Sequence, residues 1–168
     1  MFKRFLAGAI LLAMLNAPVA AQWTGSVGYG HATDDFDVGV LVGSIGYQVP
    51  VAEGFSLVPE FRLGFGVVDD SFTEGSLAAD VEIDNLYGFS NRFQLDFDND
   101  FFVYGVASYV NYKVKVSGGG VSESDSSWEW GLGLGAGYMF SANNGFDFTW
   151  ERIDGEVDLF TLAWRFRF

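Results

Sequence analysis

The sequence predicts an all-β fold: an eight-stranded antiparallel up-and-down transmembrane β-barrel formed by residues 22–168. Three observations lead to this prediction. The chain begins with the features of a secretory signal peptide, the residues that follow alternate between apolar and small or polar side chains, and the alternating segments are long. A strand that crosses a bilayer at a tilt needs about 9–11 residues, whereas strands of globular proteins usually have about 5–6.

Residues 1–21 form the predicted signal peptide. Lys3 and Arg4 precede the apolar run FLAGAILLAML, and Val19 and Ala21 occupy the small-residue cleavage positions before Gln22. A retained anchor helix is the alternative interpretation. Cleavage removes two positive charges and no acid, which takes the net charge from −13 to −15. After the cleavage position no apolar run reaches the roughly 18 residues of a transmembrane helix.

The composition narrows the possible functions. The chain has no cysteine, so disulfides and thiolate metal sites are excluded. The net charge of −13 argues against nucleic-acid binding, because nucleic-acid phosphates attract basic surfaces. Aromatic residues make up 18% of the chain and apolar residues 49%, so the fold must keep charges and aromatics on separate surfaces. We expect no cofactor and no metal.

Eight alternating segments follow one another after the signal peptide. We expect strands at residues 23–31, 38–47, 55–68, 81–95, 101–116, 127–140, 146–152 and 157–168. The first strand places His31 on the lipid side. The second is apolar on both faces, and we assign Leu41, Ile45 and Tyr47 to the outside. The third has one wholly apolar parity, made of Phe55, Leu57, Pro59, Phe61, Leu63, Phe65 and Val67.

The later strands show the same alternation. In the fifth strand the parity assigned to lipid contains Phe102, Tyr104, Val106, Val110, Tyr112, Val114 and Val116. In the sixth strand it contains Trp128, Trp130, Leu132, Leu134, Ala136, Tyr138 and Phe140, opposite a face made mostly of glycine. The fourth and seventh strands carry charges on the face assigned to the interior. In the eighth strand the lipid parity contains Phe160, Leu162, Trp164, Phe166 and Phe168.

The connections alternate in kind along the chain. VPVAEG, DND and SANNG are short turns, whereas ATDDFD, VDDSFTEGSLAAD and SGGGVSESDSS are longer, and IDGE is a tight turn on the same side as these. Short turns at one end and longer loops at the other are typical of bacterial outer-membrane barrels, whose longer loops are extracellular. A sheet can cross a bilayer only when it is closed, because the hydrocarbon offers no hydrogen-bond partners to an open edge.

Several segments resemble the small Gram-negative outer-membrane β-barrel family. They are PEFRLGFG, GLGLGAGYMF before a turn, and the terminal alternating phenylalanines. This family includes the membrane domain of OmpA, OmpX and the opacity-type proteins of the porin family. The resemblance covers the whole mature chain and implies an outer-membrane location. No C-terminal peptidoglycan-binding domain follows, so we expect the barrel alone.

The predicted interior carries charges of both signs. By parity the inward residues are Glu60, Arg62, Glu82, Asp84, Arg92, Lys113, Lys115, Glu129, Asp147, Glu151, Arg165 and Arg167. Eight strands enclose a lumen just wide enough for side chains to fill, and unpaired charges in such an interior are costly. We therefore expect a salt-bridged plug. A polar path that conducts ions, as in a narrow porin, is the alternative.

The expected extracellular loops are acidic. Their carboxylates are a solvated rim in the simpler interpretation, and the alternative is that Ca²⁺ or Mg²⁺ links them to lipopolysaccharide phosphates. No segment has the spacing of a dedicated calcium loop. Aromatics near the strand ends, which are Trp23, Tyr47, Tyr104, Trp128, Tyr138, Trp150 and Phe166, are predicted to form the two interfacial girdles.

Enzymatic barrels need a catalytic base, and His31 is the only histidine. No serine or acid with a recognisable motif shares its outward position, and Glu60 with Glu82 or Glu151 is better explained by salt bridges than by a catalytic carboxylate pair. We therefore expect a structural or surface-interaction protein and not an enzyme. A lipid-modifying enzyme and a soluble lipocalin-like barrel are the other hypotheses.

The expected partners are the lipid bilayer, lipopolysaccharide and, during biogenesis, the barrel-assembly machinery, with the protein acting as a monomer. By resemblance, the alternating apolar residues at the C-terminus are the assembly signal. These residues are Phe160, Leu162, Trp164, Phe166 and Phe168.

Overall fold

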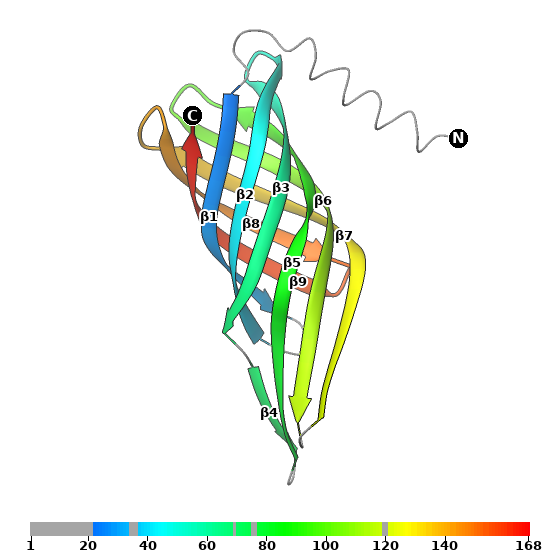
Figure 1. The fold of residues 1–168 in the computed structure, drawn as a ribbon. Helices are drawn as coiled ribbons and strands as arrows, with labels where there is room; N and C mark the ends of the chain where they lie inside the picture. Colours follow the sequence, from blue (N-terminus) through cyan, green and yellow to red (C-terminus); the bar gives the residue numbers. More distant parts are fainter. Residues whose placement is uncertain (1–21, 34–36, 69, 75–76, 119–120) are drawn as a thin grey trace, which may run out of the picture.

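The computed structural model describes residues 22–33, 37–68, 70–74, 77–118 and 121–168, with the backbone alone for 70–74, 77–82, 116–118 and 121–123. The predicted signal peptide lies outside these residues. The described residues form one antiparallel sheet that closes as an eight-stranded barrel, as predicted (Figure 1). The strands are β1 (Gln22–Thr33), β2 (Asp37–Ala52), β3 (Phe55–Val68), β4 (Asp70–Glu74), β5 (Leu77–Asp96), β6 (Phe101–Gly118), β7 (Val121–Met139), β8 (Asn144–Ile153) and β9 (Val157–Arg167).

The nine labelled strands form an eight-stranded barrel because β3 and β4 pair one after the other with the same partner strand, β5. The chain termini meet where β1 pairs with β9, from Thr24 opposite Arg167 to Thr33 opposite Asp158. The backbone N–H of Phe168 extends this seam by donating to the carbonyl of Trp23 at 3.0 Å. Closure satisfies the backbone groups of the membrane-spanning part within the sheet.

One side of the barrel is much taller than the other. β5, β6 and β7 have 20, 18 and 19 residues, whereas β8 and β9 have 10 and 11. In Figure 1, β4 and the distal ends of β5, β6 and β7 extend past the rest of the barrel, at the end opposite the C-terminus. We name this extension the tower. The sequence predicted loops at 69–80 and 117–126. Most of the described residues in these ranges instead lie in paired strands, so that prediction is wrong.

The outer wall follows the predicted parity on most strands. On β3 and β9 the outward side chains are apolar, and Phe65 and Leu162 are 56% and 60% exposed. Toward the tower, the Tyr109 ring stacks on Trp128 and lies tilted against Trp130, with ring centroids 5.0 and 4.7 Å apart. Such an exposed aromatic belt is stable at a membrane interface. In the part of the chain described here, no helix has the length and apolarity needed to cross a membrane.

The face of β6 is opposite to the prediction. Phe102, Tyr104 and Val106 are 1–5% exposed and point into the barrel. The reason lies on the neighbouring wall, where β7 turns glycines inward. A methyl group added to Gly135 would overlap the Tyr104 ring, and one added to Gly137 would overlap Phe102. Bulky β6 side chains therefore fill the space that β7 leaves empty, and the assignment of Tyr104 to an interfacial girdle is wrong.

A β-bulge changes the parity of β5. The β5–β6 register shifts between Ile83 and Asn85, so that Asp84 is the extra residue. On the C-terminal side of the bulge the even-numbered residues of β5 face inward, as Leu86 does. On its N-terminal side the odd-numbered Ile83 faces inward, at 7% exposure. Period-two counting cannot cross a bulge unchanged, which is why the prediction for Asp84 fails.

Candidate functional site

The barrel interior contains a compact group of charges in the half nearer the chain termini, which the orientation expected from the sequence places toward the periplasm. Its members come from β3, β5, β8 and β9, and each is at most 5% exposed. We name this group the ionic layer. It consists of Glu60, Arg62, Arg92, Asp147, Glu151 and Arg165.

Four members of the ionic layer form a closed ring of alternating charge. Arg92 Nε lies 2.8 Å from Glu60 Oε2, and Arg165 Nε lies 2.6 Å from Asp147 Oδ2. The cross pairs are longer, with Arg92 Nη1 3.4 Å from Asp147 and Arg165 Nη1 3.3 Å from Glu60. Each carboxylate therefore meets two guanidiniums, an arrangement that offsets the cost of burying four charges.

The other two members form a separate pair beside the ring. Arg62 Nη1 lies 2.8 Å from Glu151 Oε2, and Ser108 Oγ donates a hydrogen bond to the other oxygen of Glu151. Three carboxylates and three guanidiniums make the ionic layer neutral overall. Because its charges balance and pair with one another, the ionic layer has no net charge that would attract an ion from either side.

Tyr104 holds the ring from the β6 wall. Its hydroxyl oxygen is 2.8 Å from Asp147 Oδ1 and 2.6 Å from Thr149 Oγ1. The Arg92 guanidinium lies over the Tyr104 ring at 4.3 Å from its centroid, in cation–π geometry. This role of Tyr104 was not predicted from the sequence. The inward glycines on β7 were the signal that could have revealed it, because a bulky side chain has to fill the space beside them.

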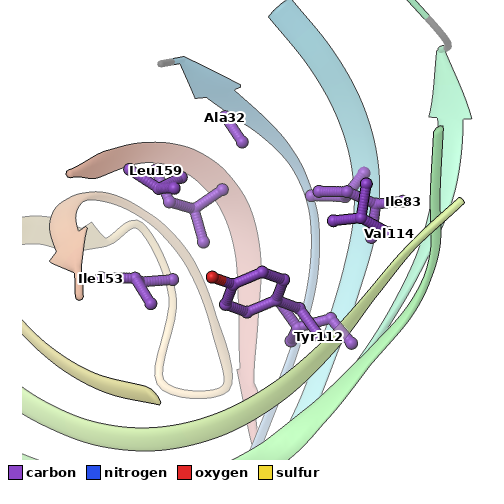
Figure 2. A pocket seen from close by; sticks show the side chains of 9 residues that line it. Ala32, Ile83, Tyr112, Val114, Ile153 and Leu159 are labelled. Atoms are coloured by element: carbon purple, nitrogen blue, oxygen red, sulfur yellow. The ribbon is translucent and has the colours of Figure 1, made fainter. Parts of the chain in front are cut away.

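An apolar group fills the extracellular half of the interior, and we name it the apolar layer. Its side chains come from β1, β2, β5, β6, β8 and β9 and are 0–7% exposed. They belong to Ala32, Val38, Val40, Val42, Ile83, Val110, Ile153 and Leu159. Figure 2 shows the Tyr112 ring pointing between Ile153 and Leu159 on one side and Ile83 and Val114 on the other.

The apolar layer is nearly solid. The space left among its side chains and Tyr112 is about 20 Å³ and has an apolar lining. That is room for about one water molecule, and an apolar cavity of this kind gives water no hydrogen-bond partners. Apolar side chains thus lie between the ionic layer and the tower end of the interior.

The remaining charges predicted to face inward lie elsewhere. Lys113 and Asp84 form an exposed ion pair of 2.8 Å, and Lys115 shares the outward parity of Lys113. These three residues are not in the lumen, because the face of β6 is reversed and β5 bulges at residue 84. The side chain of Glu82 lies outside the described residues.

Two more predicted charges lie at the ends of the interior. Glu129 is half-buried toward the extracellular end and accepts a hydrogen bond from Ser127 at 2.5 Å. Arg167 lies at the periplasmic mouth with Nη2 3.5 Å from Asp96. Among the described residues neither forms an ion pair with a member of the ionic layer, so the cluster of six is smaller than the predicted twelve.

His31 and clusters of acidic residues are the places where catalytic or metal chemistry was considered. His31 is exposed on the outer wall, with Nε2 3.5 Å from Asp37 Oδ1. Within residues 22–33, 37–68 and the other described ranges, no three His, Cys, Asp or Glu residues gather in a way that could hold a metal ion. Three acids of the expected extracellular loops, Asp34, Asp35 and Asp69, lie outside the described residues.

Comparisons with known proteins agree with this architecture. Residues 7–166 match the family model described as the outer membrane protein beta-barrel domain. Ail, the attachment invasion locus protein of Yersinia pestis, is 19% identical, with a TM-score of 0.61 over 88% of this chain and 99% of Ail. The N-terminal β-barrel domain of Pseudomonas aeruginosa OprF is 14% identical, with a TM-score of 0.60 over 88% and 99% of the two chains.

Neisserial surface protein A is also similar, at 14% identity with a TM-score of 0.54 over 88% of this chain and 95% of that protein. No curated protein sequence matches this chain. At such identities the structural likenesses establish the fold, whereas the family model spans nearly the whole chain. This protein therefore belongs to the outer membrane protein beta-barrel domain family and resides in the outer membrane.

Proposed function

We propose that this outer-membrane barrel has a structural and surface-contact role, with an interior closed to ions. The observation that carries the proposal is the filling of the lumen by two different layers. Ion passage needs a continuous hydrated path or a ring of available polar groups. Here the charges of the ionic layer bind one another, and the apolar layer leaves about 20 Å³ above them.

Single-channel recording tests the closed interior. We expect the protein reconstituted in planar bilayers to give no steady unitary current. A reproducible current of defined size would overturn the proposal and favour the narrow porin. The double variant Arg165→Ala with Leu159→Ser opens both layers and should conduct, whereas each single variant should stay closed by the intact layer.

The tower is the surface that we propose for contact outside the membrane. β7 residues 121–130 pair with β6 alone, since β8 begins its pairing at Gly131. Residues 121–127, which precede the aromatic belt at Trp128 and Trp130, span roughly 23 Å at about 3.3 Å per residue. The described side chains of this stretch are polar and exposed at Ser124, Asp125 and Ser126, as a water-facing contact surface requires.

Complementation separates the two parts of the role. Deleting the gene should make cells more permeable to a hydrophobic dye if the barrel supports envelope integrity. A variant whose β6–β7 hairpin is shortened should restore the permeability barrier, but not binding of cells to a surface. If the shortened variant restores both, the tower has no contact role, and if the deletion changes neither, the structural role is wrong too.

We infer that the protein is not an enzyme. The buried carboxylates are all held by guanidiniums, and the lone histidine is on the outer wall beside an aspartate. Replacing His31 by alanine should leave the mass spectrum of cellular lipid A unchanged. Loss of a lipid A modification in this variant would identify a lipid-modifying enzyme instead.

We propose that the outward residues of β9 and Phe168 also serve as the signal read during assembly. Leu162, Trp164 and Phe168 are 50–62% exposed and form one stripe beside the β1–β9 seam. Deleting Phe168 should lower the amount of protein in the outer membrane. Phe140→Ala is the control, because this ring is 48% exposed but lies in the β7–β8 turn. Equal levels for both variants would contradict the assembly role.

A further inference from the structure

A groove runs along the outer wall between β7 and β8, near the extracellular end. Its volume is about 500 Å³, and its residues are Trp130, Leu132, Gly133, Leu134, Trp150 and Arg152, with Gly155 at the turn. Trp130, Leu132 and Leu134 are 70%, 68% and 64% exposed, more than any other large apolar side chain described in this chain. The groove is therefore lined by the most exposed large apolar side chains of the described outer wall.

The groove has one closed and charged end. The β8–β9 turn caps it, and the backbone N–H of Asp154 donates to the carbonyl of Trp130 at 2.9 Å. Arg152 lies at this end, half-exposed on the same outer face as Trp150, and its guanidinium is 5.6 Å from the Trp150 ring centroid. A cation at the extracellular end and apolar walls below match the polarity of an anionic lipid of the outer leaflet.

The guanidinium of Arg152 is held in place by Asp158. Nε and Nη2 donate to the two carboxylate oxygens at 2.8 and 2.7 Å, and Trp150 Nε1 donates to the same carboxylate at 3.0 Å. These two bonds use two of the five N–H donors of the guanidinium, which leaves donors for a second anion. Asp158 is thus a positioning residue, which orients Arg152 toward the groove.

The position of this cation is informative because the protein is so acidic. With a net charge of −13, the chain as a whole repels an anionic membrane surface. Lys113 is a second half-exposed cation on the outer wall and, like Arg152, is paired with an aspartate, but it lies in none of the grooves described for this wall. Among the described residues, Arg152 is the cation that lines an apolar groove of the outer wall.

We propose that the groove between β7 and β8 binds one molecule of lipopolysaccharide. An acyl chain of its lipid A lies against Trp130, Leu132, Leu134 and Trp150, and a phosphate on its glucosamine accepts hydrogen bonds from Arg152. This inference rests on the proposed orientation of the protein, with the tower outside the cell. It names the site through which the barrel contacts its lipid partner.

The test compares Arg152→Gln with Lys113→Gln in the purified full barrel, with bis-phosphorylated lipid A titrated in detergent and bound lipid counted by native mass spectrometry. We expect Arg152→Gln to weaken binding by about tenfold or more, because hydrogen bonds to charged groups are among the stronger ones. Lys113→Gln should change binding by less than about twofold, since its ion pair is exposed and has no apolar groove beside it. Trp130→Ser should weaken binding through the acyl chain while leaving the phosphate contact.

Two further probes separate the sources of the effect. Dephosphorylated lipid A should bind the wild type and Arg152→Gln equally, and inorganic phosphate alone should not compete. Equal losses in Arg152→Gln and Lys113→Gln, or none in either, would overturn the site. Heat-modifiable mobility on gels shows that each variant is folded. A silent lumen in all of them would show that the closed-barrel role stands even if the groove proposal fails.

Discussion

The two halves of the lumen are filled by opposite chemistries. The periplasmic half holds three acids and three arginines in fixed ion pairs, and the extracellular half holds eight aliphatic side chains with almost no space between them. Ion pairs are directional, so losing one member strands its partners in a low dielectric. Aliphatic packing is not directional, so losing one side chain leaves a cavity that its neighbours partly fill. Single substitutions in the ionic layer should therefore lower the free energy of unfolding more than single substitutions in the apolar layer.

The largest effect is expected from Arg165→Ala. It removes a guanidinium that faces both Asp147 and Glu60, and it should lower the free energy of unfolding by about 3–5 kcal/mol. Arg167→Ala is the control, two residues along the same inward face, with a single 3.5 Å contact to Asp96. Urea unfolding of the barrel in lipid vesicles measures both. Similar losses for the two arginines would contradict a special role of the ring.

Leu159→Ala breaks the apolar layer. Leu159 is 3% exposed, so truncation should cost roughly 2–4 kcal/mol in unfolding free energy, from lost burial and the cavity left behind. Leu162→Ala, on the same strand but 60% exposed to lipid, should cost less because lipid tails fill the space. The same unfolding assay applies. A larger loss at Leu162 would mean that the interior is not packed as described.

Gly135→Ala tests the fit between the walls under the ionic layer. The added methyl group would overlap the Tyr104 ring, and overpacking of this kind costs about 1–3 kcal/mol. Gly105→Ala places the same group on the lipid face of β6, where the nearest neighbouring atom is 4.0 Å away. It should be close to neutral. If both substitutions are tolerated, Tyr104 does not depend on the space beside Gly135.

The smallest effect is expected when a whole ion pair is replaced. Arg62→Met with Glu151→Leu removes both charges, so the double variant should differ from the wild type by about 1 kcal/mol or less, whereas either single variant should lose about 3–5 kcal/mol. A double-mutant cycle from urea unfolding gives the coupling energy. Additive losses would show that Arg62 and Glu151 are not energetically paired.

Much of the fold could be predicted because alternation is a local property of a strand. The range 55–68 of β3, the outward stripes of β3 and β9, and the number of barrel walls follow from period-two patterns that depend on neighbours along the chain. Glu60, Arg62 and Arg92 were expected to face inward by the same counting, and the structure buries them at 3–5% exposure.

The errors occurred where local patterns compete. On β6 both faces are apolar, and bulk was assigned to the lipid side. The bulky side chains of Tyr104 and Phe102 instead face the interior, because Gly135 and Gly137 on β7 leave space for them. At Asp84 a bulge changed the parity, and in the tower Ser- and Gly-containing segments paired as strands although their composition suggested loops.

The sequence by itself determined a closed barrel, the lipid-facing residues of strands such as β3 and β9, and a balanced supply of interior charges. These depend on residue type and spacing, and the bilayer allows few other solutions. Only the tertiary structure decided which charges meet, that they divide into a ring of four and a pair, and that an apolar layer packs above them. These features depend on the relative register of strands far apart in the sequence and on the volume that one wall leaves for another, neither of which is encoded in any single strand.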